Sequence, residues 1–308
     1  MISLLGLAAA VALSLPLVLG FFAAVHPAFD SFAHFRVHLA VLMALCALPM
    51  LAGSMFKEAA VTLSFAVAAI ATVSASMSLP GLGQVHAAQP SEQGQPVYRL
   101  LQMNLRFDNP DPARILSLIG RMQPDVITLN EVSDMWAGKL ALLSAAYPHR
   151  IVCPFPGRHW GVAILSRRPF AAGENPACEP RGSLAIAPID FGGRVADVAA
   201  VHLAWPWPFE QARQLDALSP RLATLGETAL LAGDMNATPW SAAVARVAKA
   251  GGLTLMRSPG ATWLSRRLPD CFRTFGLPLD QVFAKGDVMV GSVRTLEDSG
   301  SDHRPVLV

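Results

Sequence analysis

The first 80 residues of the chain contain only four charged side chains. The whole sequence of 308 residues has 24 Lys and Arg and 22 Asp and Glu, so the other 42 charges lie in residues 81–308. A soluble domain has about 25% charged residues, against 15% here. This imbalance excludes one globular domain spanning the whole chain. It also excludes a disordered protein, because the polar part keeps a full set of apolar residues.

Three apolar segments in residues 1–80 predict three transmembrane helices, at about residues 2–25, 37–53 and 59–79. Crossing a hydrocarbon core about 30 Å thick takes roughly 20 helical residues, so the middle segment is at the short limit. A cleaved signal peptide is the alternative for the first segment, but that segment has no basic start and two more apolar segments follow. Basic residues in the loops are too evenly placed to decide the orientation. Residues 81–96, rich in Gly, Pro, Gln and Ser, are predicted to form a linker.

Residues 97–308 are predicted to form one α/β domain, because strand-like and helix-like segments alternate along them. Asp111 and Pro112 begin one helix, since Pro is favoured at the first helical position. Two further helices are expected at Phe209–Leu225 and Trp240–Lys249. The predicted strands are Tyr98–Asn104, Val126–Asn130, Gly161–Ser166, Leu184–Asp190, Val195–Leu203, Thr228–Gly233, Leu279–Ala284 and Val288–Arg294.

Polar side chains stand at the ends of several of these apolar strands. A carboxylate in such a place is costly unless it binds something. Several strand ends that meet at one rim would make an oxygen-rich site, which suits Mg²⁺ or Mn²⁺. The residues concerned are Asn104, Glu131, His202, Asp234, Asn236, Asp280, Asp302 and His303.

Each of these residues, taken alone, also has a purely structural explanation. Asn104 fits a strand-end turn, Glu131 fits the cap of the following helix, and His202 fits a core histidine. Asp234 and Asn236 fit an Asx turn, and the remaining three fit turn or loop positions. The order of all the motifs along the chain is what favours a functional site.

The motifs, in chain order, resemble those of the endonuclease/exonuclease/phosphatase superfamily. They are Leu-Gln-Met-Asn, Leu-Asn-Glu-Val, Ala-Val-His-Leu, Gly-Asp-Met-Asn, Leu-Asp-Gln-Val and Ser-Asp-His, with Gly161-Val-Ala-Ile-Leu-Ser-Arg between the second and third. The resemblance covers essentially all of residues 97–308. It implies a four-layer α/β sandwich, with two mostly antiparallel sheets flanked by helices. Three spans ahead of such a domain resemble a bacterial subgroup of membrane-anchored members.

The resemblance also implies a metal site that holds Mg²⁺ or Mn²⁺. Glu131 corresponds to the principal metal ligand of the family, and Asn104 stands beside it. Asp302 would complete the metal sphere directly or through water. We therefore expect these three residues to act together.

The other motif residues correspond to the catalytic groups of the family. Asp234 would orient and deprotonate the attacking water, and Asn236 would position that water and the phosphate. His202 and His303 would contact the phosphoryl oxygens. Asp280 would bond to His303, hold its tautomer and favour its protonated form. Such a set fits in-line attack on a phosphate diester, which needs charge neutralisation, a positioned water and cationic donors.

Four positions depart from the usual family pattern. Asn130 stands where the family usually has Gln, and Gln281 stands where close relatives often have His. Ala200 and Val201 replace the Asn and Thr that many relatives have before the histidine. None of these changes removes an expected ligand, but the last two remove polar groups on the substrate side.

The expected function is a membrane-anchored, divalent-metal-dependent phosphoesterase that cleaves a phosphodiester, in nucleic acid or in a phospholipid headgroup, by attack of an activated water. The alternative is a catalytically inactive binding or sensing module on the same fold. Residues 97–308 contain 22 Lys and Arg and 19 Asp and Glu. This small excess of positive charge does not favour strong binding to DNA. The expected location is the bacterial inner membrane, crossed several times, with the catalytic domain outside the cytoplasm.

Three other features stay open at the level of sequence. The aromatic segment 205–209 would stack on a base, enter a bilayer interface, or pack on its own domain. A basic stretch would meet phosphate or anionic headgroups, or face solvent. Cys153 and Cys178 would pair in an oxidising compartment, but nothing in the sequence selects that pairing. The basic stretch consists of Arg257, Arg266, Arg267 and Arg273.

Overall fold

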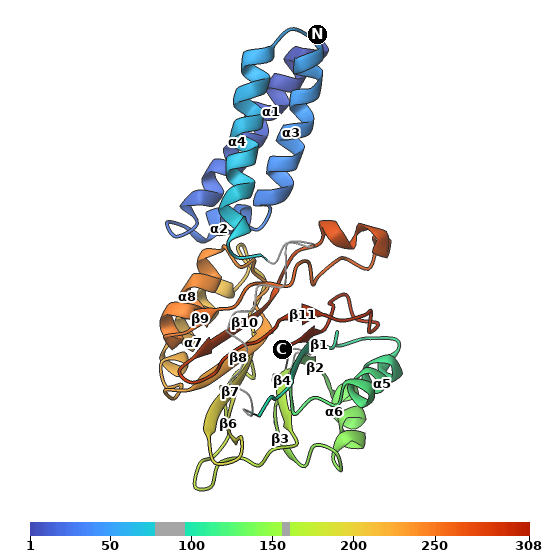
Figure 1. Ribbon diagram of the computed structural model, residues 1–308, viewed down its shortest axis with the longest axis vertical. Helices are drawn as coiled ribbons and strands as arrows, with labels where there is room; N and C mark the ends of the chain where they lie inside the picture. Colours follow the sequence, from blue (N-terminus) through green and yellow to red (C-terminus); the bar gives the residue numbers. More distant parts are fainter. Residues whose placement is uncertain (78–95, 156–160) are drawn as a thin grey trace.

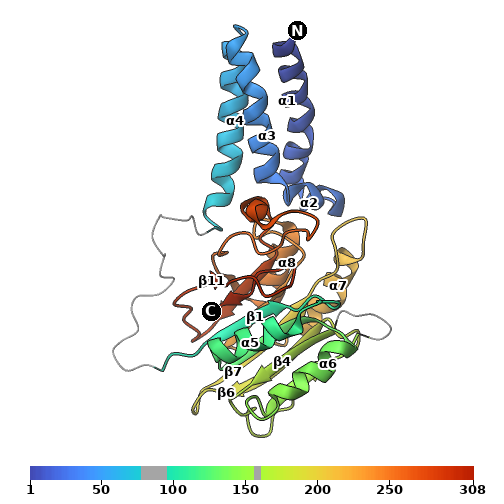
Figure 2. The same cartoon turned by 90° about the vertical axis from the view of Figure 1, so that its right-hand side faces the viewer.

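The computed structural model describes residues 1–77, 96–155 and 161–308. They form a helical bundle that stands on one end of an α/β domain, and the amino terminus lies at the far end of the bundle (Figure 1). Nearly all of the predicted linker 81–96 lies outside the described residues. The bundle nevertheless meets the domain directly, through a short helix that lies between them (Figures 1 and 2).

The bundle contains three long helices, but only two of them qualify as membrane spans. Helices α1 (Ile2–Leu19), α3 (Arg36–Ala52) and α4 (Phe56–Ser74) run side by side, and α2 (Pro27–Ala33) is the short helix at their foot. The segments at 2–22 and 56–74 are long and apolar enough to cross a membrane. The sequence-based expectation of three spans is therefore corrected to two.

The physical reason for this correction is the length of α3. Its 17 residues rise by about 25 Å, less than the hydrocarbon thickness of about 30 Å. It reaches a sufficient length only together with α2, and the two helices meet at a bend of 60°. The predicted segment 37–53 thus forms a helix, but a helix that is too short by itself.

Small side chains line the inside of the bundle, and large apolar ones cover its outside. Ala10, Ala40 and Ala47 are buried between the helices. A Cβ atom at Gly6 would lie only 2.8 Å from the carbonyl oxygen of Cys46, so glycine allows the close approach of α1 and α3. The exposed residues of α1 include Leu4, Leu5, Val11 and Leu15. Small residues between the helices and large apolar residues on the outer surface are typical of helices surrounded by lipid.

The α/β domain contains two mixed six-stranded sheets. Their strand orders are β11-β12-β1-β2-β4-β3 and β5-β6-β7-β8-β10-β9. Only β1–β2 and β7–β8 are parallel pairs, so both sheets are mostly antiparallel, as predicted. The first sheet comprises β1 (Leu100–Asn104), β2 (Val126–Val132), β3 (His149–Cys153), β4 (Gly161–Ser166), β11 (Arg294–Thr295) and β12 (Val306–Leu307). The second comprises β5 (Ala177–Cys178), β6 (Leu184–Asp190), β7 (Val195–His202), β8 (Ala229–Asp234), β9 (Thr254–Leu255) and β10 (Asp280–Lys285).

Three apolar clusters separate four layers of structure. One lies between the sheets, where Ile164 of β4 packs with Val198 of β7. A second joins the first sheet to α5 (Pro112–Met122) and α6 (Asp134–Leu140), and a third joins the second sheet to α7 (Gln211–Leu222) and α8 (Ala242–Gly251). The two helix pairs lie on opposite sides of the sheets (Figure 1). The predicted four-layer sandwich is confirmed.

Most predicted elements lie where the sequence placed them, with one exception. The strands Gly161–Ser166 and Leu184–Asp190 have the predicted bounds. The predicted strand Val288–Arg294 is wrong, because only Arg294 and Thr295 pair in this region. Their partner β12 is two residues long, and Met289 is exposed to solvent, so nothing supports a longer strand.

A disulfide joins the two sheets at their edges. Cys153 in β3 and Cys178 in β5 are bonded, with their Cα atoms 5.5 Å apart. The sequence had left this pairing open. Cys46 and Cys271 are free thiols, and Cys271 is exposed on the domain.

Candidate active site

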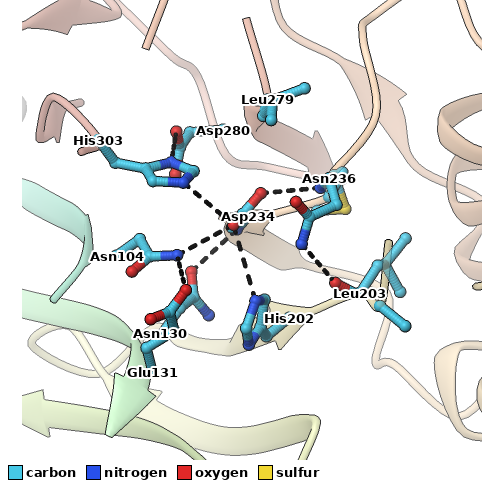
Figure 3. Close-up of polar contacts among 12 residues, drawn as sticks. Asn104, Asn130, Glu131, His202, Leu203, Asp234, Asn236, Leu279, Asp280 and His303 are labelled. Atoms are coloured by element: carbon cyan, nitrogen blue, oxygen red, sulfur yellow. Dashed lines mark hydrogen bonds and ion pairs between the residues drawn. The ribbon is translucent and has the colours of Figure 1, made fainter. Parts of the chain in front are cut away.

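The ends of neighbouring strands bring the motif residues together. In the first sheet Asn104 at the end of β1 lies opposite Asn130 of β2. In the second sheet Asp234 at the end of β8 lies between His202 of β7 and Asp280 of β10. Because parallel strands end at the same edge of a sheet, both sheets present their polar ends to one rim. Figure 3 shows the resulting cluster.

Asp234 is the centre of this cluster and is almost completely buried. Its Oδ2 atom accepts a hydrogen bond from Asn104 Nδ2 at 3.0 Å. The same oxygen lies 3.5 Å from His303 Nε2 and 3.7 Å from His202 Nε2 (Figure 3). Burial raises the pKa of Asp234 to about 6, although the neighbouring histidines oppose the rise. The carboxylate is therefore ionised near neutral pH and more basic than an ordinary aspartate.

Asp280 and His303 form a buried ion pair next to Asp234. The Oδ2 atom of Asp280 lies 2.8 Å from His303 Nδ1. Burial by itself would lower the pKa of His303, but the carboxylates of Asp280 and Asp234 raise it to about 10. His303 is thus a cation at neutral pH, and this pair is the one that the resemblance predicted.

Glu131 reaches the site through an irregularity in its strand. Pairing between β2 and β4 shifts between Leu129 and Val132, and Glu131 has a φ of 58°. Its Oε1 accepts from Asn104 Nδ2 and its Oε2 from the Phe107 backbone N–H, both at 2.9 Å. A positive φ in a residue other than glycine costs energy, and such strain concentrates at functional sites. The bulge turns the carboxylate towards Asp234.

Asn236 also has a left-handed backbone, with a φ of 44°. Its backbone N–H donates to Asp234 Oδ1 at 2.8 Å, which forms an Asx turn after β8. Its side chain Nδ2 donates to the Leu203 carbonyl oxygen at 2.8 Å. The predicted Asx turn therefore exists, and it holds Asn236 at the rim rather than excluding it from the site.

Asp302 lies apart from this carboxylate cluster. Its Oδ2 accepts from the indole Nε1–H of Trp263 at 3.2 Å, and its backbone carbonyl accepts from Arg273. Among the described residues, Asp302 does not belong to any group of side chains whose candidate metal-ligand atoms lie within 4.8 Å of one another. The structure thus brings seven of the eight predicted site residues into one hydrogen-bonded cluster and leaves the eighth beside it.

Two overlapping groups of side chains have the spacing of metal ligands. In each group the candidate ligand atoms lie within 4.8 Å of one another. The group Glu131, His202 and Asp234 fits a divalent cation because it combines two carboxylates with one imidazole, and two of its members, Glu131 and His202, line a surface pocket. In the group Asp234, Asp280 and His303, the Oδ2 atom of Asp280 and Nδ1 of His303 are already paired with each other. Glu131, which lines the pocket, is therefore the better candidate for holding a cation.

One structural residue of the site has no assigned role in the sequence analysis. Asn130 accepts from the Asp234 backbone N–H at 2.9 Å and donates to the Val201 carbonyl oxygen at 2.9 Å, so it ties the first sheet to the second. Its Oδ1 also accepts from Gln102. The signal for this role in the sequence is the amide immediately before Glu131, at a position where the family usually has Gln.

The pocket above the cluster has a mixed lining. Its lining includes Glu131, His202 and Asn236 from the cluster, together with Trp205 and Arg181. Arg181 is paired with Glu210 at 3.1 Å. A lining that combines a carboxylate with aromatic and cationic side chains suits a phosphate ester with an organic substituent.

The chain shares its fold and motifs with known proteins. Residues 101–303 match the model of the Endonuclease/Exonuclease/phosphatase family. Similar solved structures include TDP2 from D. rerio with a single-strand DNA product, at 19% identity and a TM-score of 0.51 over 68% of this chain and 97% of that chain. Sphingomyelinase C from Streptomyces griseocarneus has 18% identity and a TM-score of 0.52, over 69% and 99%. A mutant of beta toxin from Staphylococcus aureus with bound magnesium ions has 14% identity and a TM-score of 0.53, over 68% and 98%. None of the curated proteins matches the sequence.

Proposed function

The chain belongs to the endonuclease/exonuclease/phosphatase family, and on this premise we propose that it is a membrane-anchored, divalent-metal-dependent phosphodiesterase. The observation that carries the proposal is the meeting of Glu131, His202 and Asp234, whose candidate ligand atoms lie within 4.8 Å of one another. The protonated His303 beside them supplies positive charge close to Asp234.

Glu131 is the proposed principal ligand of Mg²⁺ or Mn²⁺, with Asn104 beside it. When bound, the cation neutralises negative charge on the phosphate oxygens. In this proposal Asp302 orients the site and does not bind the cation, because one of its carboxylate oxygens already accepts a hydrogen bond from Trp263. The binding of magnesium by the beta toxin structure supports the choice of metal for this fold.

Asp234 is the proposed general base. Its pKa of about 6 makes it ionised at neutral pH and able to accept a proton from water. Asn236 positions that water, whose oxygen forms the new bond to phosphorus while the ester oxygen departs. His202 and His303 donate hydrogen bonds to the phosphoryl oxygens, and Asp280 keeps His303 protonated and oriented.

The proposed location is the bacterial inner membrane, with the catalytic domain outside the cytoplasm. The apolar spans 2–22 and 56–74 support the membrane anchor. The Cys153–Cys178 disulfide supports the external placement, because disulfides persist in oxidising compartments and are rare in the cytoplasm.

Hydrolysis by the purified full-length protein tests the proposal. The protein, in detergent micelles, is incubated with bis(p-nitrophenyl) phosphate in the presence of Mg²⁺, Mn²⁺ or EDTA. Activity that requires the cation and is lost in Asp234→Asn supports a phosphodiesterase. If neither cation gives activity above that of Asp234→Asn on this ester, on single-stranded DNA or on phospholipid, the inactive binding module is the better account.

A further inference from the structure

The base of the helical bundle and the nearby part of the domain both carry exposed aromatic side chains. At the foot of the bundle Phe21, Phe22, Phe32 and Phe35 are exposed. On the domain, two segments continue this apolar surface, and we call them the aromatic collar. The collar consists of Trp205, Trp207 and Phe209 in the loop before α7, and of Leu268, Phe272 and Phe275 in and before the short helix η3 (Asp270–Phe275).

Hydrogen bonds hold both halves of the collar against the foot of the bundle. Ser31 Oγ in α2 donates to the Trp207 carbonyl oxygen at 2.9 Å. His38 Nε2, in the first turn of α3, lies 2.7 Å from the Phe275 carbonyl oxygen. In Figure 2 the orange-red helix η3 lies directly beneath the bundle, and the gold loop before α7 rises beside α2. The collar therefore lies at the level where the helices leave the membrane.

The short helix α2 fixes this arrangement. Both oxygens of the buried Asp30 carboxylate accept from the first backbone N–H groups of α8, Ala242 at 2.7 Å and Ala243 at 2.9 Å. Trp240 Nε1 donates to the Ala33 carbonyl oxygen at 2.7 Å. Buried contacts of this kind prevent the domain from swinging freely about the anchor, so the same face of the domain always meets the membrane.

The collar is also part of the active-site entrance. Trp205 lines the pocket above Glu131 and His202, and its ring contacts that of Trp263 with the centroids 5.7 Å apart. Arg273 of η3 donates to the carbonyl oxygen of Asp302, next to His303. The first collar segment thus lines the pocket through Trp205, and the second segment is hydrogen-bonded to the residue before His303.

Exposed aromatic residues beside membrane helices are typical of the membrane–water interface, where one edge of the ring is apolar and the other is wet. The exposed Arg267 next to Leu268 adds positive charge, which attracts anionic headgroups, whereas Arg266 is paired with Asp298. We propose that the aromatic collar sits in the headgroup layer of the bilayer that anchors the protein. The phosphodiester that reaches the pocket then belongs to the headgroup of a membrane lipid. Cleavage of a lipid headgroup rests on the proposed function, whereas the position of the collar in the bilayer does not.

The depth of the collar is measured with the native thiol of Cys271, which is exposed within η3. The full-length Cys46→Ala protein is labelled there with bimane and reconstituted into vesicles of phosphatidylethanolamine and phosphatidylglycerol. Quenching by lipids brominated near the headgroup, with protection from aqueous iodide, supports the collar. Quenching by iodide alone overturns it.

The substrate class is tested with the double variant Trp207→Ser/Phe275→Ser, which leaves the pocket lining unchanged. Loss of two aromatic side chains from the headgroup layer is expected to lower hydrolysis of vesicle phospholipid by about tenfold. Hydrolysis of soluble bis(p-nitrophenyl) phosphate stays unchanged. Leu142→Ser, at an even more exposed apolar position outside the collar, is the control and leaves both rates unchanged.

Two results would overturn the lipid assignment: an unchanged rate on vesicle lipid in the double variant, or preferential cleavage of single-stranded DNA by the wild type. Failure of the proposed function looks different. In that case the soluble ester is not hydrolysed with either cation, whatever depth the bimane label reports.

Discussion

The Oδ2 atom of Asp280 lies 2.8 Å from Nδ1 of His303, while the other ring nitrogen of His303 lies 3.5 Å from Asp234. The imidazole therefore bridges the residue that keeps it protonated and the proposed base. Asp280 is also the cross-strand neighbour of Asp234. The carboxylate of Asp280, the imidazolium of His303 and the carboxylate of Asp234 therefore lie in one row. We expect each of the three to have a separate role.

Asp280→Asn should lower the pKa of His303 from about 10, because it removes the closest negative charge. The expected effect on turnover is a loss of about 100-fold in kcat with little change in KM, since His303 acts mainly on the transition state. Titration of the imidazole nitrogens by NMR measures the pKa. Asp216→Asn, at an exposed ion pair, is the control. An unchanged titration of His303 would refute the pairing.

The stability of the metal-free protein should depend on pH in a direction set by the same pair. His303 in the folded state keeps its proton up to about pH 10, whereas the unfolded chain releases it near 6.5. The stabilisation is therefore fully present below pH 6.5 and is lost as the pH rises towards 10. Thermal unfolding in detergent and EDTA, followed by circular dichroism, should show a falling midpoint over this range. Asp280→Asn should flatten the dependence, and an equally steep fall in that variant would contradict it.

Asp30→Ala should destabilise the domain even though residue 30 belongs to the membrane region. The carboxylate is the acceptor for the first two N–H groups of α8, and loss of such a cap costs about 1 kcal/mol. Asp30→Asn keeps an acceptor oxygen and should lose less. Thermal midpoints of the two variants, with Ser14→Ala on the exposed side of α1 as control, measure the effect. Equal midpoints for Asp30→Ala and wild type would show that α2 does not dock on the domain.

The disulfide gives a direct test of the side of the membrane. If the domain lies outside the cytoplasm, Cys153 and Cys178 should resist a maleimide–polyethylene glycol reagent until the protein is reduced. Once the protein is denatured in SDS, Cys271 should react without reduction, which provides an internal control. Alkaline phosphatase fused to the carboxyl terminus should be active. Free Cys153 and Cys178 thiols together with an inactive fusion would place the domain in the cytoplasm.

Local patterns in the sequence were sufficient for much of the fold. The strand Gly161–Ser166 was predictable because a continuous apolar segment starts at a glycine and ends at a polar turn. The site was predictable because its residues stand at strand ends in the order of a known family. In contrast, the strand at 288–294 had a suitable composition but no partner strand long enough to pair with it.

Contacts between distant segments were beyond the reach of such patterns. Asp30 and Ala242 are separated by more than two hundred residues, and no motif marks a carboxylate that caps a distant helix. The bridging role of Asn130 depends on how the two sheets stack. The position of Asp302 depends on the indole of Trp263, a contact across the chain that its own motif does not contain.

The central claim is that Glu131 holds the catalytic cation, and comparison of two variants tests it most directly. Hydrolysis of bis(p-nitrophenyl) phosphate is measured over a range of Mn²⁺ concentrations for wild type, Glu131→Gln and Asp302→Asn, with Glu227→Gln as control. We expect Glu131→Gln to lose at least about 100-fold in activity and to require more Mn²⁺. Asp302→Asn should lose about tenfold, as a group that only orients the site. Wild-type activity and Mn²⁺ dependence in Glu131→Gln would contradict the account.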